Sequence, residues 1–192
     1  MNQQRKRRFP KWLMIFALVL AIILTAGILA NETIEKLIYP MEFVADVELN
    51  AEHYDFPPSL IYAIIHTESK FNPEAISTAD AKGLMQITDD TYRWACKRAG
   101  EESTTPDDLY NPASNIRIGC YVLSLLYEQF TETETVLAAY NAGQGRVREW
   151  LSDPAYSKDG KTLYNIPYEE TENYVRRVIN TQAKYQKLYN IQ

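Results

Sequence analysis

The chain has few of the residues that hold metal ions or build disulfide frameworks. Its 192 residues include only two cysteines, Cys96 and Cys120, and two histidines, His53 and His66. Structural zinc sites use about four cysteine or histidine ligands at short spacings, and disulfide-rich scaffolds need at least four cysteines. The sequence therefore predicts no metal centre and no fold that depends on disulfides, and no motif in it points to an organic cofactor.

Acidic residues are absent from the first 31 positions, where five of the chain's twenty basic residues lie before Trp12. Residues 31–192, by contrast, carry 15 basic and 25 acidic side chains, a net charge of −10. Because an acidic body repels phosphates, this distribution argues against nucleic acid as a partner bound through general charge.

Charged residues are also absent from a run of 19 residues, 12–30, which would span about 28 Å as a helix. This length matches the hydrocarbon core of a bilayer, Trp12 stands at its interface, and the preceding basic cluster marks the cytoplasmic side. A cleaved signal peptide is the alternative, but the run is long and lacks a clear cleavage site. We therefore expect a single-pass cell-membrane protein rather than a plain cytosolic enzyme. Its expected parts are a cytoplasmic tip 1–11, a transmembrane anchor 12–30, a linker 31–41 and an extracytoplasmic domain 42–192.

An extracytoplasmic position changes the interpretation of the two cysteines. An oxidising exterior permits a disulfide between Cys96 and Cys120. The alternative is a pair of buried thiols that pack as small apolar side chains. The sequence leaves both alternatives open.

Helical signals dominate the body of the chain. Prolines, glycines and capping residues separate seven expected helices, at about residues 43–54, 59–69, 89–99, 112–130, 134–142, 146–151 and 168–189. Ser59 is the expected cap of the second helix, Thr88 that of the third, and Gly100 follows the end of the third. Residues 152–166 contain a turn signal and are expected to form a loop or a small hairpin. The sequence thus predicts an all-α domain of about 150 residues, which is large enough for its own core.

One glutamate continues an apolar helix face. Ile61, Ile64 and Ile65 form a stripe at helical spacing, and the next position on that face is Glu68. Burial disfavours the charged carboxylate, so we expect a raised pKa for Glu68, as a general acid needs near neutral pH. The alternative is that Glu68, in the last turn beside Lys70, points to water.

Other polar groups stand where the chain turns. Glu170 begins an apolar stripe of the last helix, although acidic residues are favoured in any first turn. Gln86 follows Gly83 within an apolar run, and Tyr140 and Asn141 end another helix. Such groups can bind sugar hydroxyl and acetamido groups, or they can satisfy backbone groups of their own chain.

Four segments in order resemble sequence blocks of SLT-type lytic transglycosylases, which are lysozyme-like enzymes related to goose-type lysozyme. Residues 68–77 resemble the block E-S-x-F-x-P-x-A-x-S, and residues 83–86 the block G-L-M-Q. Residues 139–143 resemble the block A-Y-N-A-G, and residues 166–175 the block I-P-x-x-E-T-x-x-Y-V. The resemblance extends over about residues 43–185.

The resemblance implies a lysozyme-like fold and cleavage of the β-1,4 bond between N-acetylmuramic acid and N-acetylglucosamine in peptidoglycan glycan strands, with a 1,6-anhydromuramic acid end. By matching position, it implies that Glu68 is the catalytic acid and base. The residues that it places along the glycan are Ser77, Gln86, Tyr140, Asn141 and Glu170. It implies that Ser69, Met85 and Tyr174 are residues that support the site structurally.

Two other functions remain open at this level. Asp80 stands where related sequences usually have glycine, and a carboxylate that positioned a water there would make the enzyme a hydrolytic muramidase. A tethered glycan-binding scaffold without activity is the third alternative, although it would not need the acid Glu68. The sequence names no protein partner.

Overall fold

The computed structural model describes residues 11–100 and 106–191, and the chain divides after Pro40 into two compact units. The first contains the single helix α1 (Lys11–Ile38). Its 28 residues have a mean hydropathy of 2.9 in their most apolar stretch, and by length and composition they suffice to cross a membrane. The large apolar side chains of α1 are exposed within this unit, for example Phe16 and Leu18.

Helix α1 continues beyond the segment expected to be the anchor. Residues 31–38, which the sequence pattern assigned to a linker, are helical. Lys36 pairs with Glu32 at 2.6 Å, one helical turn earlier, and this spacing supports a helix. Most of the segment expected to be the linker is thus part of the same helix as the expected anchor.

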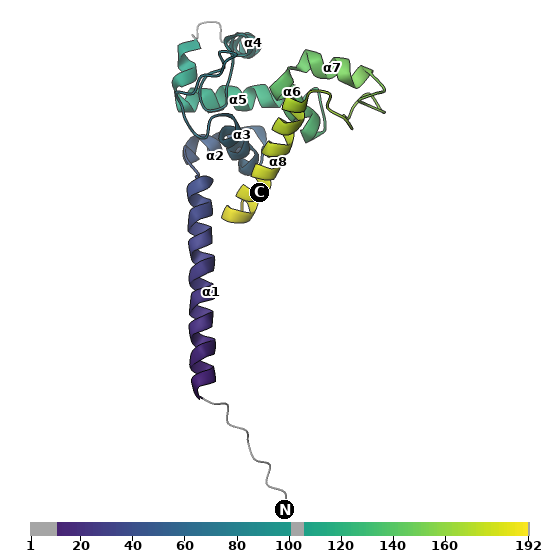
Figure 1. Cartoon of the computed structure of the whole chain (residues 1–192). Coiled ribbons are helices and arrows are strands. Elements are labelled where there is room, and N and C mark those ends of the chain that lie inside the picture. Colours follow the sequence, from purple (N-terminus) through teal and green to yellow (C-terminus); the bar gives the residue numbers. More distant parts are fainter. Residues whose placement is uncertain (1–10, 101–105, 192) are drawn as a thin grey trace, which may run out of the picture. The chain divides into compact units, whose positions relative to one another are not determined.

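The second unit, from Met41 onward, is built from helices and turns (Figure 1). Its elements are α2 (Val44–Tyr54), α3 (Pro58–Glu68), α4 (Asp89–Ala99), the 3₁₀ helix η1 (Pro106–Tyr110), α5 (Pro112–Tyr127), α6 (Thr133–Ala142), α7 (Gln144–Ser152) and α8 (Glu169–Tyr189). Over the described residues, extended pairing is limited to isolated bridges that Lys82 makes with Ile76 and Ile87. The prediction of an all-α domain is confirmed, and within the segment 152–166 residues 153–166 form a loop rather than a hairpin.

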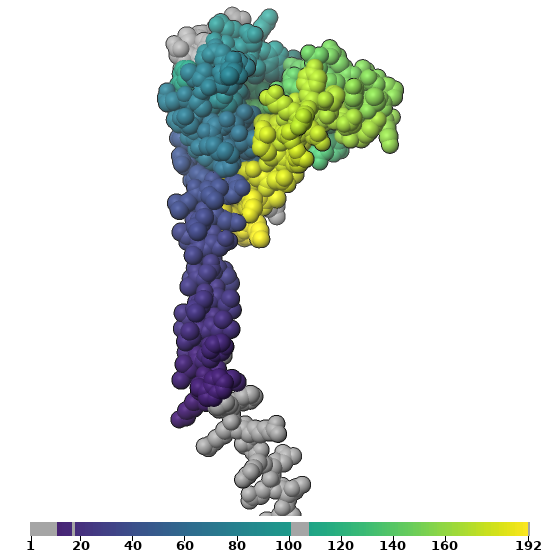
Figure 2. All heavy atoms as spheres, in the orientation of Figure 1, coloured from purple at the N-terminus to yellow at the C-terminus, as the bar shows by residue number. Residues whose placement is uncertain are grey.

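The core lies around α3, which packs against α8 along its length, while α5 contacts α2, α4 and α6. Ile61, Ile64 and Ile65 have no exposed surface, and Tyr62 stacks on Tyr185 of α8 with ring centroids 5.4 Å apart. Figure 2 shows α8, in yellow, lying between the segments coloured blue to teal and those coloured green. An apolar α3 is thus enclosed, and its last residue is where the core ends.

Helix ends follow the sequence signals in most places. The Thr88 hydroxyl accepts a hydrogen bond from the Thr91 amide at 3.2 Å, and Gly100 ends α4 with φ 76°. At α3 the expectation differs from the structure, because the helix begins at Pro58 and Ser59 is fully buried. Proline fixes its own φ and needs no amide partner in a first turn, so it starts the helix without a side-chain cap.

The structure has no disulfide between Cys96 and Cys120, and both side chains are buried, which agrees with the alternative of two buried thiols. Cys120 lies on the inner face of α5 with no exposed surface, and burial raises the pKa of its thiol. The two residues pack as small apolar side chains, so the fold does not depend on an oxidised pair.

One buried amide holds the loop between α3 and α4. The Asn115 side chain of α5 accepts a hydrogen bond from the Met85 amide at 2.7 Å and donates to the carbonyls of Lys82 and Leu109 at 2.9 and 2.8 Å. Gly83 fits beneath this amide only because it lacks a Cβ, which would lie 2.2 Å from the Leu109 carbonyl oxygen. Asn115 of α5 therefore holds the backbone of the loop that follows α3.

We expect Gly83→Ala to lower the free energy of unfolding by about 2–4 kcal/mol, because φ there is 75° and the added methyl meets the Leu109 carbonyl and the Asn115 amide. Urea unfolding of the full chain in detergent measures this. Gly145→Ala is the matched control, since a Cβ there meets nothing within 4 Å and α7 favours alanine. Equal stability of the two variants would contradict the role of Gly83.

Candidate active site

A groove of about 420 Å³ opens where α3 ends. Its walls come from the last residue of α3, the loop 77–88, the first turn of α4, the end of α6 and the start of α8. All six residues that the sequence analysis placed at the reacting glycan line it: Glu68, Ser77, Gln86, Tyr140, Asn141 and Glu170. Segments up to about 100 residues apart in the sequence thus meet at one carboxyl group.

Glu68 is partly exposed at the floor of this groove, with most of its surroundings belonging to the core. Burial raises its pKa to about 7 from an ordinary value of 4.5, which confirms the expected rise. Tyr174 and the positive charge of Arg177 oppose the rise. The carboxyl therefore exists in both protonation states near neutral pH.

Two tyrosines enclose this carboxyl. Tyr174 of α8 is buried, and its hydroxyl has no hydrogen bond of 3.5 Å or less within the described part of the chain, yet it is the main group lowering the pKa of Glu68. The Tyr140 hydroxyl donates to the Met85 carbonyl at 2.9 Å. Burial and the charge of Glu68 raise the pKa of both phenols, so both stay neutral.

Met85 and Ser69 lie behind the groove rather than in it. Met85 is fully buried against Gly119 of α5, where a Cβ would lie 2.3 Å from its Sδ atom. The Ser69 hydroxyl donates to the Leu84 carbonyl at 2.8 Å and so ties the end of α3 to the loop. The Ser69 contact fixes the backbone directly after Glu68, and the Met85 contact holds the following loop against α5.

Two amides present different faces to the groove. The Gln86 amide nitrogen donates to the carbonyls of Ala75 and Gly83 at 3.1 and 2.8 Å, so its carbonyl oxygen is left for a ligand. The Asn141 carbonyl oxygen accepts a hydrogen bond from the Thr171 hydroxyl at 2.8 Å, so its amide nitrogen is left to donate. Gln86 therefore both satisfies the backbone and lines the groove, two roles that the sequence had offered as alternatives.

Thr171 is a site residue to which the sequence analysis gave no role. It is buried at the start of α8, next to Glu170 in the sequence, and holds Asn141 of α6. Its position inside the same block as Glu170 is the only signal that the sequence carries. A hydrogen bond between two helices is not visible from spacing along one of them.

Ser77 and Asp80 shape the opposite wall. The Ser77 hydroxyl accepts hydrogen bonds from the amides of Ala79 and Ala81 at 3.2 and 3.1 Å. Asp80 has φ 58°, a left-handed conformation that aspartate tolerates better than most residues. Its carboxyl lies 3.5 Å from the Lys82 ammonium, and Asp80 is not among the groove-lining residues. The groove's carboxyl groups are thus Glu68 and the exposed Glu170.

Within residues 11–100 and 106–191, no group of three or more histidine, cysteine, aspartate or glutamate side chains could hold a metal ion. The chemistry available at the groove is that of a carboxyl group with a pKa near 7, two amides and hydroxyl groups. Such a set suits proton transfer to and from an uncharged polar ligand.

Most of this groove lies in a segment that matches a known protein family. A model of the transglycosylase SLT domain matches residues 47–163, more than half of the chain. The chain belongs to this family. The matched segment contains α3, the loop that follows it and α4 to α7, so the SLT domain supplies every wall of the groove except the start of α8.

Relatives of this SLT domain are longer proteins. The soluble lytic murein transglycosylase of Escherichia coli (strain K12) is 38% identical over 134 residues, which cover 68% of this chain and 21% of that protein. The membrane-bound lytic murein transglycosylase C of Actinobacillus pleuropneumoniae serotype 5b is 32% identical over 167 residues, which cover 75% of this chain and 46% of that protein. The chain therefore corresponds to less than half of the length of either relative.

Solved structures share the fold of the SLT domain. The 70-kDa soluble lytic transglycosylase of Escherichia coli has a TM-score of 0.71 and 31% identity over 81% of this chain and 26% of that one. Its complex with bulgecin A has a TM-score of 0.72 at the same identity and coverage. These structures confirm the lysozyme-like fold class expected from the sequence.

We expect Glu68→Gln to remove a destabilisation of the folded state that increases with pH, because the buried carboxyl of the wild type must ionise as pH rises. In the wild type the folded pKa, about 7, exceeds the unfolded value of 4.5, so stability is full below pH 4.5 and falls as pH rises to about 7. The total loss corresponds to about 3 kcal/mol. Urea unfolding at pH 5 and pH 8 should show that the free energy of unfolding of the variant, relative to that of the wild type, is higher at pH 8 than at pH 5.

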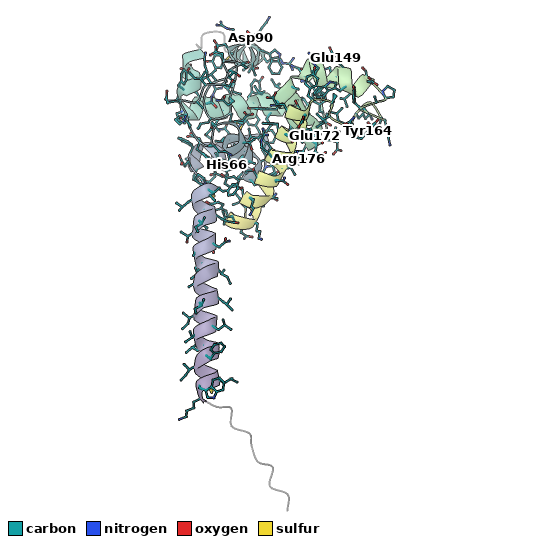
Figure 3. All side chains as sticks on the ribbon, in the orientation of Figure 1. His66, Asp90, Glu149, Tyr164, Glu172 and Arg176 are labelled. Carbon is teal, nitrogen blue, oxygen red and sulfur yellow. The ribbon has the colours of Figure 1, made fainter. Side chains whose placement is uncertain are left out.

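The control for this variant is Glu172→Gln, which removes an exposed carboxyl from α8 that does not line the groove (Figure 3). Its stability should follow the wild-type pH dependence. If Glu68→Gln did so as well, the carboxyl of Glu68 would not be desolvated in the folded protein.

Proposed function

We propose that the chain is a membrane-anchored peptidoglycan lytic transglycosylase that acts in cell-wall remodelling. It cleaves the β-1,4 bond between N-acetylmuramic acid and N-acetylglucosamine and leaves a 1,6-anhydromuramic acid end. The observation that carries this proposal is the partly buried Glu68, with a pKa of about 7, at the floor of a groove lined by amides and hydroxyls. The family and its named relatives support it.

One carboxyl group then performs both proton transfers. Protonated Glu68 donates its proton to the glycosidic oxygen as the bond to the anomeric carbon breaks, while the N-acetyl group of the muramic acid stabilises the developing positive charge. The carboxylate so formed takes the proton of that sugar's C6 hydroxyl, whose oxygen attacks the anomeric carbon and closes the 1,6-anhydro ring. A pKa of about 7 lets the same group act as acid and base at neutral pH.

An internal nucleophile explains why the reaction needs no second carboxylate beside the sugar. An attacking hydroxyl on the same ring has an effective molarity of about 10⁵ M or more in a favourable geometry. Ordinary glycosidases instead use a pair of carboxyl groups, one of which activates water or attacks the sugar. Glu68 alone therefore suffices for the ring closure that we propose.

The remaining groove residues bind the glycan. The Asn141 amide nitrogen and the Gln86 carbonyl oxygen are free to pair with acetamido and hydroxyl groups, and Ser77, Tyr140 and Glu170 complete the contacts. No lysine, arginine or histidine lies among the residues that line the groove. Recognition therefore relies on hydrogen bonds to sugar rings rather than on attraction of a charged ligand, which suits an acidic domain.

The anchor sets where the reaction takes place. Helix α1 is long and apolar enough to cross a bilayer, and a relative that covers 75% of this chain is named as membrane-bound. The five basic residues before Trp12 put the N-terminus in the cytoplasm and the SLT domain outside, by the positive-inside rule. Glycan close to the membrane is then the substrate.

Digestion of purified peptidoglycan with the full chain in detergent tests the reaction. Mass spectrometry of the released muropeptides should find anhydromuramic ends, which weigh 18 Da less than reducing ends because no water is added. Glu68→Gln should release none above background, whereas Glu172→Gln should match the wild type. Reducing ends would show a hydrolytic muramidase, and binding of glycan without release of fragments would show a scaffold.

Thr171→Val should lower kcat/KM by about tenfold, because the isosteric change frees the Asn141 amide to rotate and leaves its oxygen unpaired. Thr171→Ser keeps a hydroxyl at this position and should restore most of the activity. Melting temperatures of both variants separate this effect from unfolding. Equal activity of the valine and serine variants would show that the hydroxyl does not orient Asn141.

A further inference from the structure

The wall of the groove opposite α8 is a loop with little regular structure, residues 75–88. Ser77, Thr78, Ala79 and Ala81 line the groove from this loop, and Thr88 and Thr91 line it from the start of α4. Three of these, Ser77 to Ala79, form an exposed turn together with Asp80. A turn of this kind needs an additional restraint if it is to meet a sugar at a fixed distance.

Lys82 supplies such a restraint from behind the wall. Its ammonium lies 2.7 Å from the Asp89 carboxyl, in the first turn of α4, and 3.5 Å from the Asp80 carboxyl, in the turn. Its backbone forms bridges with Ile76 and Ile87 on either side. Lys82 thus joins the turn, the bridge residues Ile76 and Ile87, and the first turn of α4. It does not line the groove itself.

The burial of these groups shows which ion pair matters. The Lys82 side chain is 15% exposed and that of Asp89 34%, whereas that of Asp80 is 70% exposed. Water weakens an exposed pair more than a covered one. The 2.7 Å contact with Asp89 is therefore the principal restraint, and Asp80 adds a weaker one that holds the tip of the turn.

We propose that Lys82 is a positioning residue for glycan binding, which sets the distance between the turn 77–80 and α4 through its ion pairs with Asp89 and Asp80. The ligand is a strand of β-1,4-linked N-acetylated sugars, so this proposal rests on the function proposed above. Lys82 acts on the wall rather than on Glu68, which lies at the end of α3. Its removal should accordingly weaken binding and leave the chemical step almost unchanged.

Kinetics on peptidoglycan with the full chain test the split between binding and chemistry. Lys82→Met, which keeps the length of the side chain, should raise KM about three- to tenfold and leave kcat within twofold. Lys82→Arg keeps the charge and should restore KM. Asp89→Asn should raise KM more than Asp80→Asn, and the double variant Lys82→Met with Asp89→Asn should be no worse than Lys82→Met alone.

Asp90→Asn is the matched control for Asp89→Asn. Asp90, labelled in Figure 3, lies in the same first turn of α4, so its replacement has a similar effect on the helix dipole. Unlike Asp89, it forms no ion pair with any residue that the structure describes. The KM of this variant should equal that of the wild type. A rise in KM with Asp90→Asn as large as with Asp89→Asn, or a lower melting temperature for Lys82→Met without a change in KM, would overturn the proposal.

A binding measurement separates this proposal from the proposed reaction. Calorimetry with a β-1,4-linked N-acetylglucosamine tetramer, in the Glu68→Gln background, should show affinity reduced about three- to tenfold by Lys82→Met and little by Lys82→Arg. Anhydro products from the wild type with no effect of Lys82→Met on KM or affinity would overturn the role of Lys82 alone. A Lys82-dependent affinity without anhydro products would overturn the reaction alone, and absence of both binding and products would overturn both.

Discussion

Desolvation of the Glu68 carboxyl is the constraint on which the rest of the structure depends. Helix α3 is enclosed by the core along its apolar face, and its last residue emerges at the groove floor. The carboxyl is thus partly surrounded by protein and partly open to a ligand, which raises its pKa to about 7. Partial burial of the carboxyl lowers the stability of the folded protein, and the proposed proton transfers use the raised pKa that results.

The loop after α3 is held by side chains instead of by regular secondary structure. The amide of Asn115 fixes it from α5, the hydroxyl of Ser69 from α3 and the phenol of Tyr140 from α6. Four non-glycine residues around it adopt positive φ: Lys70, Phe71, Asp80 and Gln86. Unfavourable backbone conformations of this kind persist only where the surroundings enforce them, and here they lie beside the groove.

Much of the fold was predictable from local signals, because these act within a few residues. The Thr88 cap, the Gly100 end of α4 and the apolar stripe that reaches Glu68 were all read from neighbouring positions. The cap prediction that failed concerned competition between local signals, because Ser59 is an acceptable cap but lies buried after Pro58. The helix of the apolar segment also continues through residues 31–38, where the sequence places the start of the linker.

The sequence by itself determined the all-α class, the apolar N-terminal helix and, through four blocks in order, the residues that gather at the groove. Only the tertiary structure decided how those residues are oriented: that Thr171 turns the Asn141 amide, that Gln86 gives its nitrogen to the backbone, and that Lys82 joins the turn to α4. It also buries Cys96 and Cys120 without a disulfide between them. Helix periodicity fixes which face a residue occupies, but hydrogen bonds and ion pairs between elements depend on the packing of helices that are distant in the chain.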